Sequence, residues 1–83
     1  MTYRLTTLAG ERAHTIRVEG QLTTDAVPDL EWEVARISWP VELDLSGLVS
    51  ADGDGLQELR SLSARGAKLS GASPYIRQLL DAG

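Results

Sequence analysis

The sequence contains no cysteine, no phenylalanine and only one histidine among its 83 residues. Without cysteine the chain has no disulfide framework, no thiolate metal site and no cysteine nucleophile. The same absence fits a reducing compartment, and we expect the protein to be cytoplasmic. The core must be built from Leu, Val, Ile and Ala, together with Trp32 and Trp39 if these two side chains turn inward.

Long hydrophobic runs and excess positive charge are also missing. No stretch approaches the about 20 apolar residues that a membrane-spanning helix needs, and Tyr3, Arg4 and Thr6 interrupt any signal peptide. Eight Lys and Arg against twelve Asp and Glu give a formal net charge of −4, so we expect no nucleic-acid partner. The remaining composition, 42% hydrophobic and 24% charged, is typical of one small globular domain over residues 1–83.

Apolar periodicity divides the first half of the chain into strands and a helix. Alternation over Tyr3–Leu8 and His14–Glu19 predicts two strands joined as an antiparallel hairpin. Helical spacing follows over Asp25–Ile37, and the side-chain oxygens of residues 23–25 are suited to capping this helix. Alternation returns over Val41–Leu45, which predicts a third strand.

The segment that follows the third strand is rich in glycine and polar residues. We predict a loop over Ser46–Gly55, in which the apolar residues 48 and 49 point into the core. A second helix is predicted over Gly55–Ala64, where leucines recur at helical spacing. Asp54, followed three residues later by Gln57, resembles a capping box for this helix.

A fourth strand over Ala67–Ser70 and a short helix from Pro74 complete the predicted order β-β-α-β-α-β-α. Strand–helix–strand units imply parallel neighbours, so the hairpin and these units form a mixed sheet. The carboxylates of Glu42 and Asp44 make burial on both faces of the sheet unfavourable. The predicted fold class is therefore α/β (mixed α+β), with a four-stranded mixed sheet, three helices mainly on one face and a wetter opposite face.

Groups that could carry catalysis are few. His14 lies near the hairpin turn, where we interpret it as a surface residue. No phosphate-binding glycine motif is present, and Asp52–Gly55 lacks the later oxygen ligands of a calcium loop. Asp44 and Asp52 could form a carboxylate pair, but turn formation and helix capping explain them better. We expect a protein that is not an enzyme and that binds no metal or cofactor.

Three segments, in this order, resemble the STAS domain family of bacterial anti-sigma-factor antagonists: Val41–Leu48, Ala51–Leu56 and Arg65–Leu69. Weaker similarity extends to Val18–Thr23 and Ala72–Arg77, so that the resemblance spans almost the whole chain. It implies a STAS-like fold and a non-catalytic role in which the domain binds a partner protein, an anti-sigma factor that is also a kinase.

The chain departs from this family at one position of its regulatory motif. Regulatory members carry Asp-Ser-x-Gly, and the resemblance places the aspartate at Asp52, the phosphorylatable serine at Gly53 and the glycine at Gly55. Because glycine has no hydroxyl, phosphorylation cannot occur at residue 53. The serines Ser46 and Ser50 lie nearby in sequence but not at the motif position.

The resemblance leaves two roles open. The first is signalling, in which the domain binds an anti-sigma factor and thereby regulates transcription; the second is a structural or regulatory subunit that docks on the ATPase of a transport complex. In the first role the predicted contact surface is the loop and the outward face of the second helix: Ser46, Ser50, Asp52, Gly53, Asp54, Gly55, Gln57, Glu58, Arg60 and Ser61. In the second role the domain would dock through a helix face. The strand over Ala67–Ser70 is predicted to have an unpaired edge, which could also support a homodimer.

Overall fold

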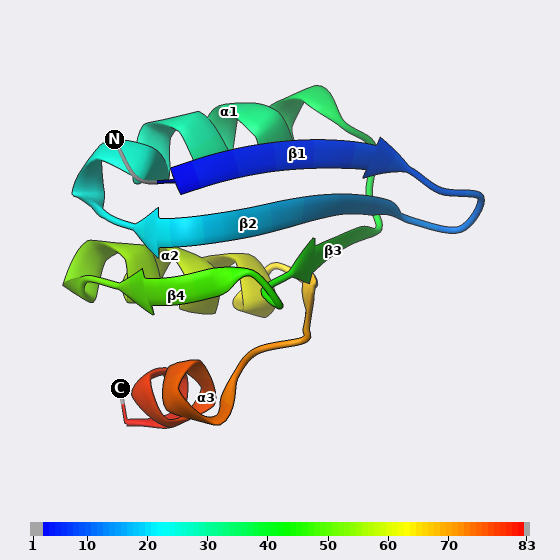
Figure 1. Ribbon diagram of the computed structural model, residues 1–83. Helices are drawn as coiled ribbons and strands as arrows, with labels where there is room; N and C mark the ends of the chain where they lie inside the picture. Colours follow the sequence, from blue (N-terminus) through cyan, green and yellow to red (C-terminus); the bar gives the residue numbers. More distant parts are fainter. Residues whose placement is uncertain (1–2, 83) are drawn as a thin grey trace.

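The computed structural model describes residues 3–82, which form five strands, three α-helices and one 3₁₀ helix (Figure 1). In chain order these are β1 (Tyr3–Ala9), β2 (His14–Leu22), η1 (Thr24–Ala26), α1 (Val27–Arg36), β3 (Val41–Asp44), β4 (Leu48–Ala51), α2 (Gly53–Ala64), β5 (Lys68–Ser70) and α3 (Pro74–Asp81). The elements predicted from the sequence are all present, and η1 and β4 are additional.

The sheet is mixed, as predicted. β1 and β2 pair antiparallel, and the parallel strands β3 and β4 both pair with β2, one after the other along the same edge. β5 pairs with β3, which gives the order β1-β2-β3-β5 with β4 beside the end of β2. The prediction of four strands was therefore wrong by one, because residues 48–51 form a strand and not part of a loop.

A shift in register explains why β4 lacks a clear sequence signal. Gly20 pairs with Leu48 and Gln21 with Ser50, so that Val49 is an extra residue in the ladder. Leu48 is buried, as expected, but Val49 is 67% exposed instead of lying in the core. Alternation is lost at this irregularity, and the segment consequently resembles a loop in sequence.

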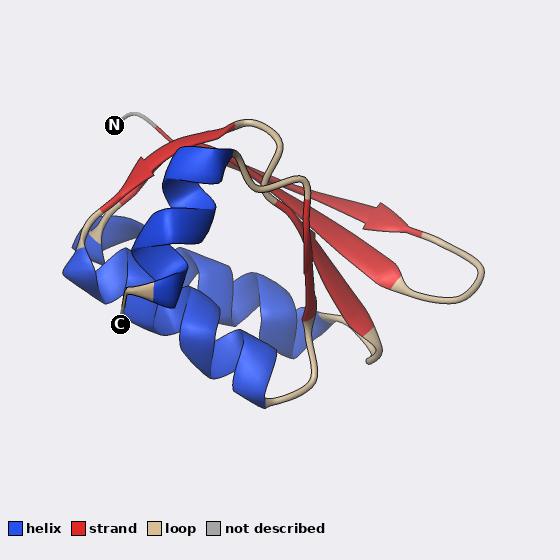
Figure 2. Ribbon diagram, turned by 90° about the horizontal axis from the view of Figure 1, so that it is seen from below, coloured by secondary structure: helices blue, strands red, loops and turns tan. Residues whose placement is uncertain are grey.

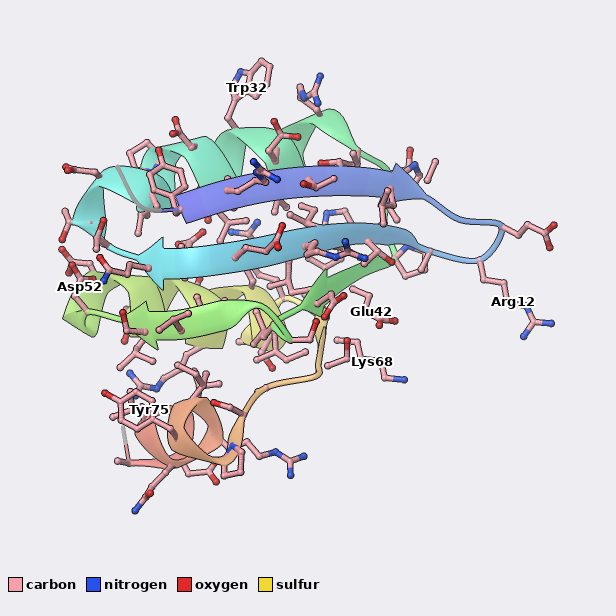
Figure 3. All side chains as sticks on the ribbon, in the orientation of Figure 1. Arg12, Trp32, Glu42, Asp52, Lys68 and Tyr75 are labelled. Atoms are coloured by element: carbon pink, nitrogen blue, oxygen red, sulfur yellow. The ribbon has the colours of Figure 1, made fainter. Side chains whose placement is uncertain are left out.

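Helices α1 and α2 cover one face of the sheet, whereas α3 lies along the edge formed by β4 and packs against α2 (Figures 1 and 2). The core lies between the sheet and this helix layer. Trp32 and Trp39 stay outside it, where they are 60% and 40% exposed respectively, and Trp32 points away from the sheet (Figure 3). The buried apolar residues are Ile16, Val18, Leu22, Ala26, Leu30, Val34, Val41, Leu43, Leu45, Leu48, Leu59, Leu62, Ala67 and Ile76.

The opposite face of the sheet carries polar side chains, as the alternation in β3 predicts. Arg17 Nε lies 3.5 Å from Asp44 Oδ2 on the neighbouring strand, and the Ser70 hydroxyl donates to Glu42 Oε2 at 2.8 Å. Glu42 pairs in register with Lys68, and both side chains are visible on this face (Figure 3). Within residues 3–82, no helix has the length and hydrophobicity needed to cross a membrane.

Candidate functional site

The first turn of α2 meets the end of β2 at one end of the molecule. β2 leads into η1 and β4 leads into α2 at this end, where Asp52 lies (Figure 3). Gly55 makes the approach possible, because a Cβ atom at this position would lie 2.2 Å from the carbonyl oxygen of Leu22. The local fold therefore depends on a glycine at position 55 for packing.

Asp52 is the N-cap of α2 and links two elements. Its Oδ1 accepts a hydrogen bond from the Gly55 N–H at 2.8 Å, and its Oδ2 accepts from the Thr24 N–H at 2.9 Å and from the Thr24 hydroxyl at 3.1 Å. These donors, led by the Gly55 N–H, lower the pKa of Asp52 below its ordinary value. Capping is thus the structural role of Asp52, as the sequence favours, but the proposed Asp54–Gln57 capping box is wrong because α2 begins at Gly53.

Thr24 contributes to this site although the sequence indicates another role for it. Its hydroxyl lies 2.9 Å from Asp54 Oδ2 as well as near Asp52, so it joins η1 to the first turn of α2. The expected capping of α1 by residues 23–25 is wrong, since no side chain caps either η1 or α1. The chain enters α1 through the 3₁₀ turn instead.

The structure places the predicted contact residues in several separate parts of the domain. Asp52, Gly53, Asp54 and Gln57 are exposed around the first turns of α2, and Ser61 is half-buried on the same helix. Ser46 lies in the turn at the opposite end of β4, where its N–H donates to Asp44 Oδ1 at 3.0 Å. Ser50 lies within β4 opposite Gln21. Neither serine takes part in the group around Asp52.

Two of the predicted contact residues are buried, and the side chain of a third, Arg60, forms hydrogen bonds within the domain. Gly55 is buried against Leu22, and Glu58 is only 8% exposed, so the expectation that Glu58 faces outward was wrong. Arg60 is half-buried and donates to the carbonyl oxygens of Leu79 at 2.9 Å and Leu80 at 3.2 Å. Its guanidinium therefore supplies donors to the last turn of α3.

We expect Arg60→Met to loosen α3, because methionine keeps much of the apolar stem and removes both hydrogen bonds. A charge-assisted hydrogen bond contributes about 1.5–3 kcal/mol, so amide exchange in α3 should accelerate by about tenfold or more. Hydrogen exchange measured by NMR tests this, with the amides of α1 as the internal reference. Unchanged protection in α3 would show that Arg60 does not stabilise this helix.

Position 53, where the resemblance places the phosphorylated serine, is open. A Cβ atom on Gly53 would have no neighbour within 4 Å beyond its own helix and chain neighbours. A side chain would fit at this position. The hydroxyl is missing because residue 53 is a glycine, and not because the fold leaves no space for a serine. Next to it a groove of about 440 Å³ runs between α1 and α2, lined by Thr24, Val27, Pro28, Asp54, Gln57, Glu58 and Ser61.

Three ionisable side chains, those of Glu58, Glu31 and Arg65, interact with one another between α1 and α2. Burial is the main cause that raises the pKa of Glu58, to about 7, and the neighbouring carboxylate of Glu31 raises it further. The pKa of Glu31 is lowered, first by the hydrogen bond with Glu58 and then by Arg65, whose Nη1 lies 3.1 Å from Glu31 Oε2. Glu58 therefore holds the proton of this carboxyl pair because it is the more buried member. Sequence periodicity gave no sign of this pair.

Residues 3–82 thus form a mixed α+β domain with an exposed helix N-terminus and a neighbouring groove, and no group of acidic or histidine side chains among them is arranged to bind a metal ion. No protein-family model and no curated protein sequence matches the chain. Solved structures do. The STAS domain of an antisigma-factor antagonist from Rhodobacter sphaeroides is 25% identical, with a TM-score of 0.62 over 88% of this chain and 94% of that one.

The anti-sigma-factor antagonist SpoIIAA in its unphosphorylated form is also similar in structure, with a TM-score of 0.65 at 20% identity. The match covers 98% of this chain and 83% of SpoIIAA. The predicted resemblance is confirmed at the level of the fold: this chain is a STAS-like domain.

Proposed function

We propose that this domain is a non-catalytic protein-interaction module that binds an anti-sigma factor through the exposed first turns of α2. The observation that carries the proposal is the open surface at Gly53, beside Asp54, Gln57 and the groove between α1 and α2. The fold supports it as well, since both similar structures are antagonists of anti-sigma factors.

The same surface indicates how such binding would be controlled. Gly53 offers no hydroxyl to a kinase, so the domain would bind its partner without a phosphorylation switch at this position. Asp54 is exposed and Asp52 keeps its charge down to low pH, because its pKa is lowered. Carboxylates on an interface rim speed the encounter with a basic surface more than they raise affinity. The partner surface should therefore be basic.

Gln57→Arg tests the proposal by placing a positive charge and extra bulk at the centre of this surface. We expect capture of the partner from a lysate of the source organism to fall by about tenfold or more, as for a residue central to an interface. Gln78→Arg is the matched control, because Gln78 is also an exposed glutamine but lies on α3. Mass spectrometry should identify the captured protein as an ATP-binding, kinase-like regulator.

Two results would contradict the proposal. One is equal capture of the same protein by the wild type and by Gln57→Arg, with circular dichroism showing that both are folded. The other is a captured protein of a different class, for example the ATPase of a transport complex, which would support the structural-subunit role instead.

A further inference from the structure

The groove between α1 and α2 combines apolar walls with acidic groups. Val27 and Pro28 form the α1 side, and Asp54 and Glu58 lie on the α2 side with Gln57 and Ser61. An anion would meet two carboxylates there, and Glu31 is a third beside Glu58. The chemistry of the lining therefore favours a cation attached to an apolar stem.

Glu58 gives this groove an unsatisfied acceptor. Glu58 is more than nine-tenths buried, and apart from the carboxyl pair that it forms with Glu31, no N–H or O–H group of the described residues donates to its Oε2. A buried acceptor without a donor costs about 1–3 kcal/mol, and more when it is charged. A donor that enters through the groove would recover this free energy.

We propose that the groove receives one cationic side chain, an arginine or a lysine, from the partner protein, and that its charged group pairs with Glu58. The methylene stem would pack against Val27 and Pro28, while Asp54 and the Ser61 hydroxyl would lie near the charged end. The inference rests on the proposed function and adds to it the chemistry of the residue that the partner inserts.

Binding of a cation should release the proton that Glu58 holds. The groups that face Glu58 are Glu31 from α1, which forms a hydrogen bond with it, and Arg65 at the C-cap of α2, which acts on it from a distance. Asp54 lines the same groove. Because the pKa of Glu58 is about 7, its ionised fraction rises about tenfold between pH 6 and pH 8, and affinity for a cation should rise with it.

The experiment uses the neutral-backbone probe N-acetyl-arginine methylamide and its uncharged analogue with citrulline in place of arginine. In ¹⁵N-resolved NMR titrations at pH 8, the arginine probe should shift the amides around the groove, from Thr24 to Val27 and from Asp54 to Ser61. Binding of the arginine probe should be about tenfold weaker at pH 6, and at pH 8 the citrulline probe should bind at least about tenfold more weakly than the arginine probe.

Glu58→Gln should reduce binding of the arginine probe at pH 8 by about tenfold, whereas Glu33→Gln, on the opposite side of α1 near β1, should leave it unchanged. Equal shifts with arginine and citrulline on the wild type would overturn the proposal, whether or not the variant folds. Partner capture that persists without arginine binding would refute this inference alone. Arginine binding without any captured partner would refute the proposed function.

Discussion

Gly55→Ala is expected to destabilise the domain by about 3 kcal/mol or more, although it adds a single methyl group to a helix. The new Cβ atom would lie 2.2 Å from the Leu22 carbonyl oxygen and 3.1 Å from the Leu22 Cγ. Leu22 is fully buried at the end of β2, so it cannot move aside without disturbing the core. The first turn of α2 would have to move away from the sheet instead.

Such a movement would also break the hydrogen bonds that converge on Asp52. Its Oδ1 accepts from the Gly55 N–H, and the Asp52 N–H donates to the Leu22 carbonyl at 3.1 Å. The link from Asp52 to Thr24 would weaken at the same time. The substitution therefore costs more than the steric overlap alone, because the overlap and the helix cap share the same atoms.

Gly53→Ala is the matched control, two residues earlier on the same helix. Its Cβ atom would have no neighbour within 4 Å, and alanine loses less backbone entropy on folding than glycine does. This variant should be as stable as the wild type or more stable by up to about 1 kcal/mol. Urea unfolding followed by circular dichroism compares the three proteins. Similar midpoints for both variants would show that α2 can shift freely on β2.

The sequence was sufficient to predict most of the fold because its apolar periodicity and its buried positions agree. Ile16 and Val18 alternate with polar residues and are fully buried, and Leu59 and Leu62 occupy the helical positions expected of them. β4 was missed because it has only four residues and one of them, Val49, is extra in the ladder. Short strands with irregular register have no reliable periodicity.

The candidate site was predictable only where it depends on local sequence. Capping by Asp52 depends on a spacing of three residues, which the sequence contains. The contact between Thr24 and Asp52 joins residues 28 positions apart, and no local pattern encodes it. Glu58 was placed on the outer face because it is charged, but α2 packs on α1 as well as on the sheet, and this second contact buries it.

Glu58→Gln is expected to stabilise the domain at pH 8 by about 2–3 kcal/mol and to have little effect at pH 4.5. The pKa of Glu58 rises from 4.5 to about 7 on folding, so the folded state binds a proton that the unfolded state has lost. The resulting stability is fully present below pH 4.5 and is lost as the pH rises to about 7. Glutamine imitates the protonated form and keeps a donor for Glu31, so the variant retains this stability at high pH.

Glu33→Gln should show the opposite pH dependence, so comparing it with Glu58→Gln separates the effects of the two carboxyl groups on stability. The Thr7 hydroxyl, 2.8 Å from Glu33 Oε1, and Arg36, at 3.0 Å, lower the pKa of Glu33, so its stabilising effect is present above pH 4.5 and is lost as the pH falls. This variant should therefore be less stable than the wild type at pH 8 and approach it in acid. Urea unfolding at pH 3, 4.5, 6 and 8 measures both slopes, that of Glu33→Gln below pH 4.5 and that of Glu58→Gln above it. Parallel pH profiles for the wild type and Glu58→Gln would mean that Glu58 is ionised in the folded domain at neutral pH, and the groove would then already hold the charge that a cationic partner requires.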